Sequence, residues 1–151
     1  MSDIDSELHG LVERLHSTTV RIREVAAGDA GDILEHWELS ADQANRLVNA
    51  LLDAVLREVD RGVTESILYA LGEPSVSQEC RGERWERLVP ILGSFDVECL
   101  EYAIELLGNS DDAKTLRVIE SYRDNQEPGV RESVQDALEL IERRRVRRSA
   151  P

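Results

Sequence analysis

Aromatic residues are scarce in this sequence, with one Phe, two Trp and three Tyr among 151 residues. Strands favour β-branched and aromatic side chains, whereas a chain rich in Leu and Glu suits helix packing. A chain of this length buries roughly two-thirds of its unfolded surface, so it needs neither a disulfide nor a metal to fold. The scarcity of aromatic residues therefore argues against a sheet protein and predicts an all-α fold.

Cysteine is also rare, and long apolar runs are lacking. The two cysteines, Cys80 and Cys99, are too few for a disulfide framework. The segment Met1 to Asp5 is acidic and lacks the apolar stretch of a signal peptide. No run of 18 apolar residues is present to cross a membrane. These features predict a reduced, cytoplasmic protein that has no membrane partner.

Positive charge is in short supply, since 18 Lys and Arg stand against 31 Asp and Glu, for a net charge of −13. Such an excess repels nucleic acid and anionic membranes at long range and attracts basic partners. The charge therefore predicts a basic protein as partner and makes nucleic acid an unfavoured one.

Motifs of known catalytic chemistry are missing as well. The sequence contains no Gly-rich phosphate loop, no nucleophile elbow and no Cys-x-x-Cys. His9, Glu13 and His16 share one helical face and have a spacing that a transition metal accepts, but such residues more often lie on a solvated face. We therefore predict no enzyme activity, no cofactor and no bound metal.

Apolar residues recur with the helical period along the whole chain. In the first forty residues they predict a helix over 3–16, a short helix from Val20 that stops near Gly28 and Gly31, and a helical turn over 32–37. Beyond these they predict three helix pairs, over 41–72, 82–108 and 111–145, and the first helices of the last two pairs cover 82–92 and 111–123. Ser40-Ala41-Asp42-Gln43, at the start of the first pair, has the form of a capping box. Two Leu-Gly stops, at Gly72 and Gly108, lie 36 residues apart, where a helix C-terminus often takes a left-handed residue.

The second helix of each pair carries a motif: Asp or Pro, then Val, then a small residue, then Leu. The segments Asp60-Arg61-Gly62-Val63, Pro128-Gly129-Val130-Arg131 and Ala137-Leu138 show it best. This pattern resembles HEAT repeats of small bacterial proteins over roughly residues 41–145, and Pro90 fits the proline of their first helices. The middle pair departs from it, because Asp96-Val97-Glu98 lacks the Val-Arg step.

The resemblance implies a short right-handed α–α solenoid of about three hairpins within a single domain, residues 1–151. Residues 1–40 would form an N-terminal helical cap and residues 146–151 a basic tail. Stacked hairpins bury their apolar faces against one another. An ordinary, non-repeating helical bundle is the alternative.

In such a stack the second helices line the concave side, and their exposed positions are acidic with two tyrosines. Rows of carboxylates attract a basic surface, and Tyr is a preferred interface anchor. A generic solvated face is the alternative reading. The predicted protein-binding residues are Glu65, Tyr69, Glu98, Glu101, Tyr102, Glu105, Glu132, Asp136 and Glu139.

Charge and resemblance together predict a non-catalytic protein-binding module. It is similar to immunity proteins and antitoxins, which neutralise a basic toxin domain, such as a nuclease, by covering its active site. An adaptor or scaffold for another protein is the first alternative. A HEAT-like DNA glycosylase is the second, and the acidic charge disfavours it. The arginine-rich segment 143–148 would contact phosphate or fold back on the acidic body.

Overall fold

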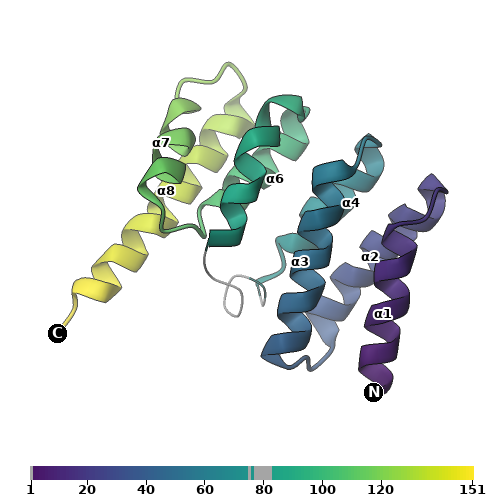
Figure 1. The fold of residues 1–151 in the computed structure, drawn as a ribbon. Coiled ribbons are helices and arrows are strands. Elements are labelled where there is room, and N and C mark those ends of the chain that lie inside the picture. Colours follow the sequence, from purple (N-terminus) through teal and green to yellow (C-terminus); the bar gives the residue numbers. More distant parts are fainter. Residues whose placement is uncertain (1, 75, 77–82) are drawn as a thin grey trace. The chain divides into compact units, whose positions relative to one another are not determined.

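The computed structural model describes residues 2–74, 76 and 83–151, and every element in them is a helix (Figure 1). The all-α prediction is therefore confirmed. The chain forms the following helices in order: α1 (Asp3–Leu15), α2 (Val20–His36), α3 (Ala41–Arg57), α4 (Arg61–Leu71), the 3₁₀ helix η1 (Glu83–Ser94), α6 (Val97–Leu107), α7 (Ala113–Ser121) and α8 (Pro128–Ser149). Cys80 and Gly82 lie outside the described residues.

The chain divides into two compact units, residues 1–80 and 81–151. In unit 1, α1 pairs with α2 and α3 pairs with α4, and α2 and α4 share the most extensive contact. Small side chains allow that contact to be close: a Cβ placed on Gly31 of α2 would lie 3.5 Å from the Cβ of Ala70 in α4. Unit 1 therefore consists of two helical hairpins whose second helices lie against each other. The single domain and the solenoid stay predictions.

Helix α2 differs from its prediction, because it continues through both Gly28 and Gly31 to His36. A Gly inside a helix costs about 1 kcal/mol relative to Ala. The apolar stripe does not stop at the glycines, however: Ala26, Ala30 and Ile33 are all buried. Burial of this stripe against α1 and α4 outweighs the two glycines. The prediction of a short helix followed by a separate turn was wrong, and residues 1–40 contain a full hairpin.

Replacing Gly28 with Ala should stabilise unit 1. The residue is exposed in mid-helix, and a Cβ added there would meet no atom within 4 Å. Ala loses less conformational entropy on folding, so we expect the free energy of unfolding to rise by about 0.5–1 kcal/mol. Urea unfolding followed by circular dichroism measures this change. Gly10→Ala in α1, which has the same open surroundings, should behave alike, and a loss of stability in both variants would contradict this account.

Unit 2 is organised around α6, which contacts η1, α7 and, most extensively, α8. The segment predicted as a helix over Gly82–Leu92 is instead a 3₁₀ helix that contains Pro90. Proline has no N–H to donate and disrupts an α-helical ladder. A 3₁₀ helix turns every three residues, which suits the buried pair Trp85 and Leu88. Predicting an ordinary helix here was wrong.

Gly72 and Gly108 cap α4 and α6 as predicted, but neither adopts a left-handed conformation: their φ values are −78° and −59°. The reason for glycine at Gly108 is space. A Cβ there would lie 3.1 Å from the Cα and Cβ of Ala137 and 3.0 Å from the carbonyl oxygen of Glu105. Gly108 thus lets the end of α6 approach α8 closely.

The arginine-rich segment at the end of α8 folds back on unit 2 in part. Arg144 is buried and donates to the backbone carbonyls of Gly108 at 2.6 Å and Ser110 at 2.9 Å. Its Nε also donates to the Asp111 carboxylate at 3.3 Å, and Arg148 donates to the same carboxylate at 2.8 Å. These two arginines therefore fasten α8 to the loop between α6 and α7.

A half-buried ion pair connects the turns of unit 1. Arg23 of α2 donates to both carboxylate oxygens of Glu58, at 2.8 and 3.0 Å, and to the carbonyl of Ser17 at 2.9 Å. Glu58 also accepts the backbone N–H groups of Val59 and Asp60. One carboxylate therefore connects α2 with the turn between α3 and α4.

Candidate protein-binding surface

Helices α6 and α8 bring four carboxylates together in unit 2. Glu101 and Glu105 lie one helical turn apart on α6, and Glu132 and Asp136 lie one turn apart on α8. On each helix these residues lie beside the buried positions and not among them. They therefore lie at the edge of the contact between α6 and α8. We call these four residues the acidic cluster.

Glu105 lies at the centre of the acidic cluster. Desolvation raises its pKa above the ordinary value of a glutamate. A hydrogen bond from the Ser133 hydroxyl, at 3.3 Å, acts in the opposite direction. The negative charges of Asp136, Glu101 and Glu132 raise the pKa further. The four groups are thus close enough for their charges to disfavour one another.

Glu101 is positioned by a glycine on the neighbouring helix. Its carboxylate occupies the space over Gly129, where any Cβ would overlap it. Gly129 belongs to the first turn of α8, next to Pro128, and the helix dipole favours an anion there. The Pro-Gly start of α8, which the HEAT-like motif singled out, therefore makes room for an acidic side chain.

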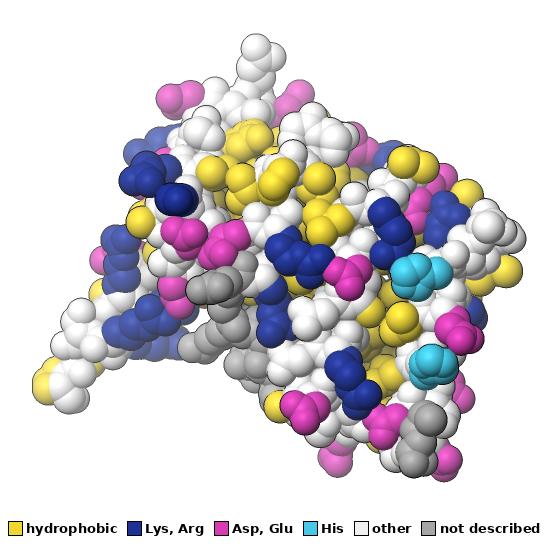
Figure 2. Space-filling view, viewed as in Figure 1, with side chains coloured by type: hydrophobic (Ala, Val, Ile, Leu, Met, Phe, Trp, Pro, Cys, Tyr) yellow, Lys and Arg dark blue, Asp and Glu magenta, His cyan; other side chains and the backbone are white. Residues whose placement is uncertain are grey.

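In the part of the chain that the structure describes, no cation is paired with the acidic cluster. Among the residues that the structure describes, no Arg or Lys forms an ion pair with Glu101, Glu105, Glu132 or Asp136. The arginines of α8 instead pair with Asp111, Glu139 and Glu142. On the face drawn in Figure 2, acidic and basic side chains are interspersed. The four carboxylates are therefore available to a cation from outside.

The other predicted binding residues are distributed more widely. Glu98 and Tyr102 lie on the same face of α6 as the acidic cluster, Glu98 exposed and Tyr102 half-buried. Glu65 and Tyr69 belong to α4 in unit 1, where Glu65 pairs with Arg61 at 2.7 Å and Tyr69 is 63% exposed. A continuous row through both units stays a prediction.

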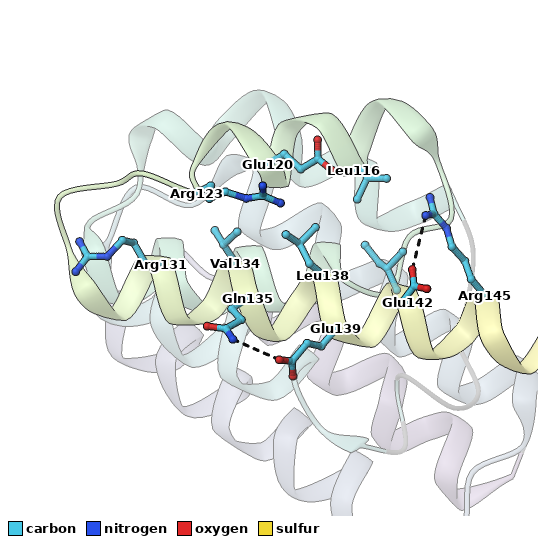
Figure 3. Close-up of a pocket in the computed structure, with 11 residues that line it drawn as sticks. Leu116, Glu120, Arg123, Arg131, Val134, Gln135, Leu138, Glu139, Glu142 and Arg145 are labelled. Carbon is cyan, nitrogen blue, oxygen red and sulfur yellow. Dashed lines mark hydrogen bonds and ion pairs between the residues drawn. The ribbon is translucent and has the colours of Figure 1, made fainter.

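Glu139, the remaining predicted residue, lines a groove between α7 and α8 (Figure 3). The groove has a volume of about 820 Å³. Apolar side chains, among them Leu116 and Leu138, form its floor, and charged residues of both signs form its rims. The apolar pattern did not predict this groove, because Leu138 belongs to the HEAT-like motif, whose apolar residues are expected to be buried. In the structure, α7 has only 9 residues and is too short to cover the 22 residues of α8.

His9, Glu13 and His16, which were considered as metal ligands, do not form a common site. His9 pairs with Glu13 at 3.2 Å, and His16 Nε2 lies 3.2 Å from a guanidinium nitrogen of Arg57. Within the described ranges, no three His, Cys, Asp or Glu side chains are grouped to hold a metal ion. None of the helices described is long and apolar enough to cross a membrane.

Comparison with known proteins shows the fold alone. No protein-family model and no curated protein matches the chain. A crystal structure of an engineered protein, from the Northeast Structural Genomics Consortium, is similar with a TM-score of 0.64 and 22% sequence identity. The match covers 93% of this chain and 64% of the engineered one, so this chain spans less than two-thirds of that protein. The resemblance to HEAT repeats stays a prediction.

Proposed function

We propose that this chain binds a basic protein through the acidic cluster and has no catalytic role of its own. The observation that carries the proposal is the gathering of four carboxylates without a cation among the described residues. Like charges that are held close together oppose folding. A cation from a binding partner would offset this repulsion, which gives the arrangement a functional explanation. Functional sites commonly carry a group with a shifted pKa, and the pKa of Glu105 is raised here.

An immunity protein or antitoxin is the class of binder that we infer. Carboxylates spaced along two helices would take the place of nucleic-acid phosphates at the cationic site of a toxin, such as a nuclease. The net charge of −13 would speed the encounter, and Tyr102 would supply apolar contact area beside the charges. An adaptor for another basic protein would use the same surface. The identity of the captured partner distinguishes an adaptor from an immunity protein or antitoxin.

Reversing three charges of the acidic cluster tests the proposal. A tagged chain with Glu101, Glu105 and Asp136 replaced by Lys should no longer retain the partner that the wild-type chain captures from its native host. With the purified partner at low salt, association should slow by about tenfold or more. Surface plasmon resonance at two salt concentrations measures this rate.

A control variant separates the site from total charge. Glu7, Glu38 and Asp124 are exposed and lie outside the acidic cluster, so replacing them by Lys changes the net charge equally. Capture by this control should persist. If both variants lost capture equally, the effect would come from net charge and not from the acidic cluster. If the first variant still captured the partner, the acidic cluster would not be part of the interface. Tight DNA binding at physiological salt would support the disfavoured glycosylase class instead.

Glu105→Gln should stabilise unit 2 at neutral pH while weakening partner binding. The raised pKa of Glu105 means that the folded state holds the proton more tightly than the unfolded state does. Ionisation of Glu105 at pH 7 therefore opposes folding, and its removal should add roughly 0.5 kcal/mol, the size of a like-charge contact. The gain should vanish as pH falls below the glutamate range. Urea unfolding at pH 7 and pH 3 checks this, and a destabilised variant at pH 7 would contradict it.

A further inference from the structure

Helix α8 is divided into an acidic part and a basic part. Residues 132–142 contain four acidic side chains and no Arg or Lys, whereas five of the six residues 143–148 are Arg. Glu132 and Asp136 belong to the acidic cluster, while Glu139 and Glu142 line the groove between α7 and α8. Arg144 is buried, but Arg143 and Arg145 remain more than half exposed. The helix therefore offers opposite charges along one accessible side.

The same side of α8 also offers apolar surface. The floor of the groove includes Leu116 and Leu138, both only partly buried. Further along the helix, Val146 is 62% exposed among arginines. In Figure 1 the C-terminal turns of α8 project beyond α7. Unit 2 therefore presents both an open groove and a protruding helix end that carries an apolar side chain.

We propose that a second copy of this chain docks on the groove, with the two α8 helices antiparallel. If the two-fold axis passes near Ile141, residue 139 of one helix faces residue 143 of the other. Glu139 then lies opposite Arg143 of the second copy, and the reverse contact repeats it. Val146 reaches the level of Asp136 in the other copy, beside the part of its groove that Leu138 lines.

Charge complementarity selects a second copy as the occupant. The order of charges along α8, acidic and then basic, matches itself only when the second helix runs in the opposite direction. A parallel arrangement would place arginines against arginines. In the single chain, the nearest cation to Glu139 is Arg143 of its own helix, at 3.6 Å, so an antiparallel pair would join four alternating charges into one network. Networks of this kind are worth more than isolated surface pairs.

The proposed contact between the two α8 helices is small, so we expect a low affinity. Helix α8 has 22 residues and is about 33 Å long at 1.5 Å per residue, and only part of it is free. Interfaces below roughly 1,200 Å² are typically weak and transient. Surface ion pairs are also screened by salt. We therefore expect a salt-sensitive dimer that dissociates on dilution. The dimer contact requires neither Glu101 nor Glu105, and its test uses Glu139 and Arg143, which lie outside the acidic cluster.

Charge exchange between two variants tests the dimer and its direction. Glu139→Arg and Arg143→Glu each place like charges opposite each other in a dimer of identical chains, so each alone should dimerise at least tenfold more weakly than the wild-type chain. A one-to-one mixture of the two restores opposite charges at both contacts and should dimerise again. Sedimentation velocity over a range of concentrations, at low and high salt, measures all three. Both side chains are about half exposed or more, so folding should be unaffected, and circular dichroism verifies it.

The possible outcomes separate clearly. Rescue in the mixture supports the antiparallel pair, because neither overall charge nor misfolding explains it. A wild-type chain that stays monomeric at every concentration overturns the proposal. So does a dimer that both single variants form as well as the wild-type chain, since its interface would lie elsewhere. Loss of dimer in the single variants without rescue in the mixture overturns the antiparallel register.

Discussion

Arg144→Ala is expected to destabilise unit 2 by about 2–3 kcal/mol, because two carbonyls near the end of α6 lose a charged hydrogen-bond donor. Those carbonyls belong to Gly108 and Ser110, and both receive hydrogen bonds from the guanidinium at 2.9 Å or less. The side chain is only 10% exposed, so water does not readily replace it in the folded state. The alkyl part of Arg144 is lost from the packing as well.

A tryptophan reports on unit 2 separately from unit 1. Trp85 is fully buried in unit 2, whereas Trp37 belongs to unit 1 and is 41% exposed. In a Trp37→Phe background, urea unfolding followed by fluorescence therefore monitors unit 2. Arg147→Ala, an exposed position in the same helix, is the matched control and should change the free energy of unfolding by less than about 0.5 kcal/mol. Equal effects of the two substitutions would show that Arg144 contributes no more than a surface arginine does.

The arginine-rich segment also illustrates how far the sequence could lead. Its composition predicts a basic segment. With five arginines in six residues, however, composition does not tell which arginine is buried. The fold distinguishes them, since Arg144 lies on the buried side of α8 and Arg143 on the exposed side. The helical period alone could have assigned Arg144 to that side, because it follows Ala137 and Ile141 at spacings of seven and three residues. Its carbonyl partners are contacts distant in sequence, which a helical pattern does not predict.

Helices were predictable where a long apolar stripe and a cap coincided. Ser40 caps α3 through a capping box with Gln43, as the sequence predicted. The prediction failed at Gly28 and Gly31. There the low helix propensity of glycine is outweighed by the burial of the apolar side of α2. It failed again around Pro90, where the segment is a 3₁₀ helix that buries Trp85 and Leu88. Local signals therefore located the elements, and tertiary packing decided their extent and type.

The candidate site was predicted in part for a related reason. Exposed acidic positions on α6 and α8 follow from the helical period, and four of them do meet. Glu139 instead lines the groove, because helix α7 packs on that side of α8 and leaves a gap. The length of α7 was misjudged in the sequence, where a helix was expected from Asp111 to Arg123. A helix shorter by two residues at each end exposes a side of its neighbour that the apolar pattern assigns to the core.

Glu58→Ala should lower the stability of unit 1 by about 2 kcal/mol, because a part-buried ion pair loses one partner and two backbone N–H groups lose their acceptor. The Glu58 side chain is 5% exposed and that of Arg23 is 15% exposed. Removal of the carboxylate leaves the guanidinium of Arg23 without its counter-charge and frees the N–H groups of Val59 and Asp60. Those two groups belong to the turn between α3 and α4. The substitution should therefore loosen both the α2 contact and this turn.

The Glu58 interaction also predicts how stability changes with pH. Burial opposes ionisation of Glu58, but hydrogen bonds from Arg23 and from the backbone N–H groups outweigh it, and the pKa falls below the ordinary 4.5. A carboxyl with a lowered folded-state pKa contributes its full stabilisation above the unfolded-state value. It loses this stabilisation as pH falls through the folded-state value. The wild-type chain should thus lose stability on acidification below about pH 4.5, and the loss should be smaller in Glu58→Ala.

Thermal unfolding of both chains between pH 7 and pH 3, followed by circular dichroism, measures the difference. Glu7→Ala is a matched control, since Glu7 is an exposed glutamate of the same unit, and it should retain the wild-type pH dependence. If Glu58→Ala and the wild-type chain lost stability in parallel on acidification, Glu58 would not be the group responsible. The Arg23–Glu58 pair would then hold its geometry without contributing to the acid sensitivity of unit 1, and Asp5, whose pKa is also lowered, would be the next carboxylate to replace.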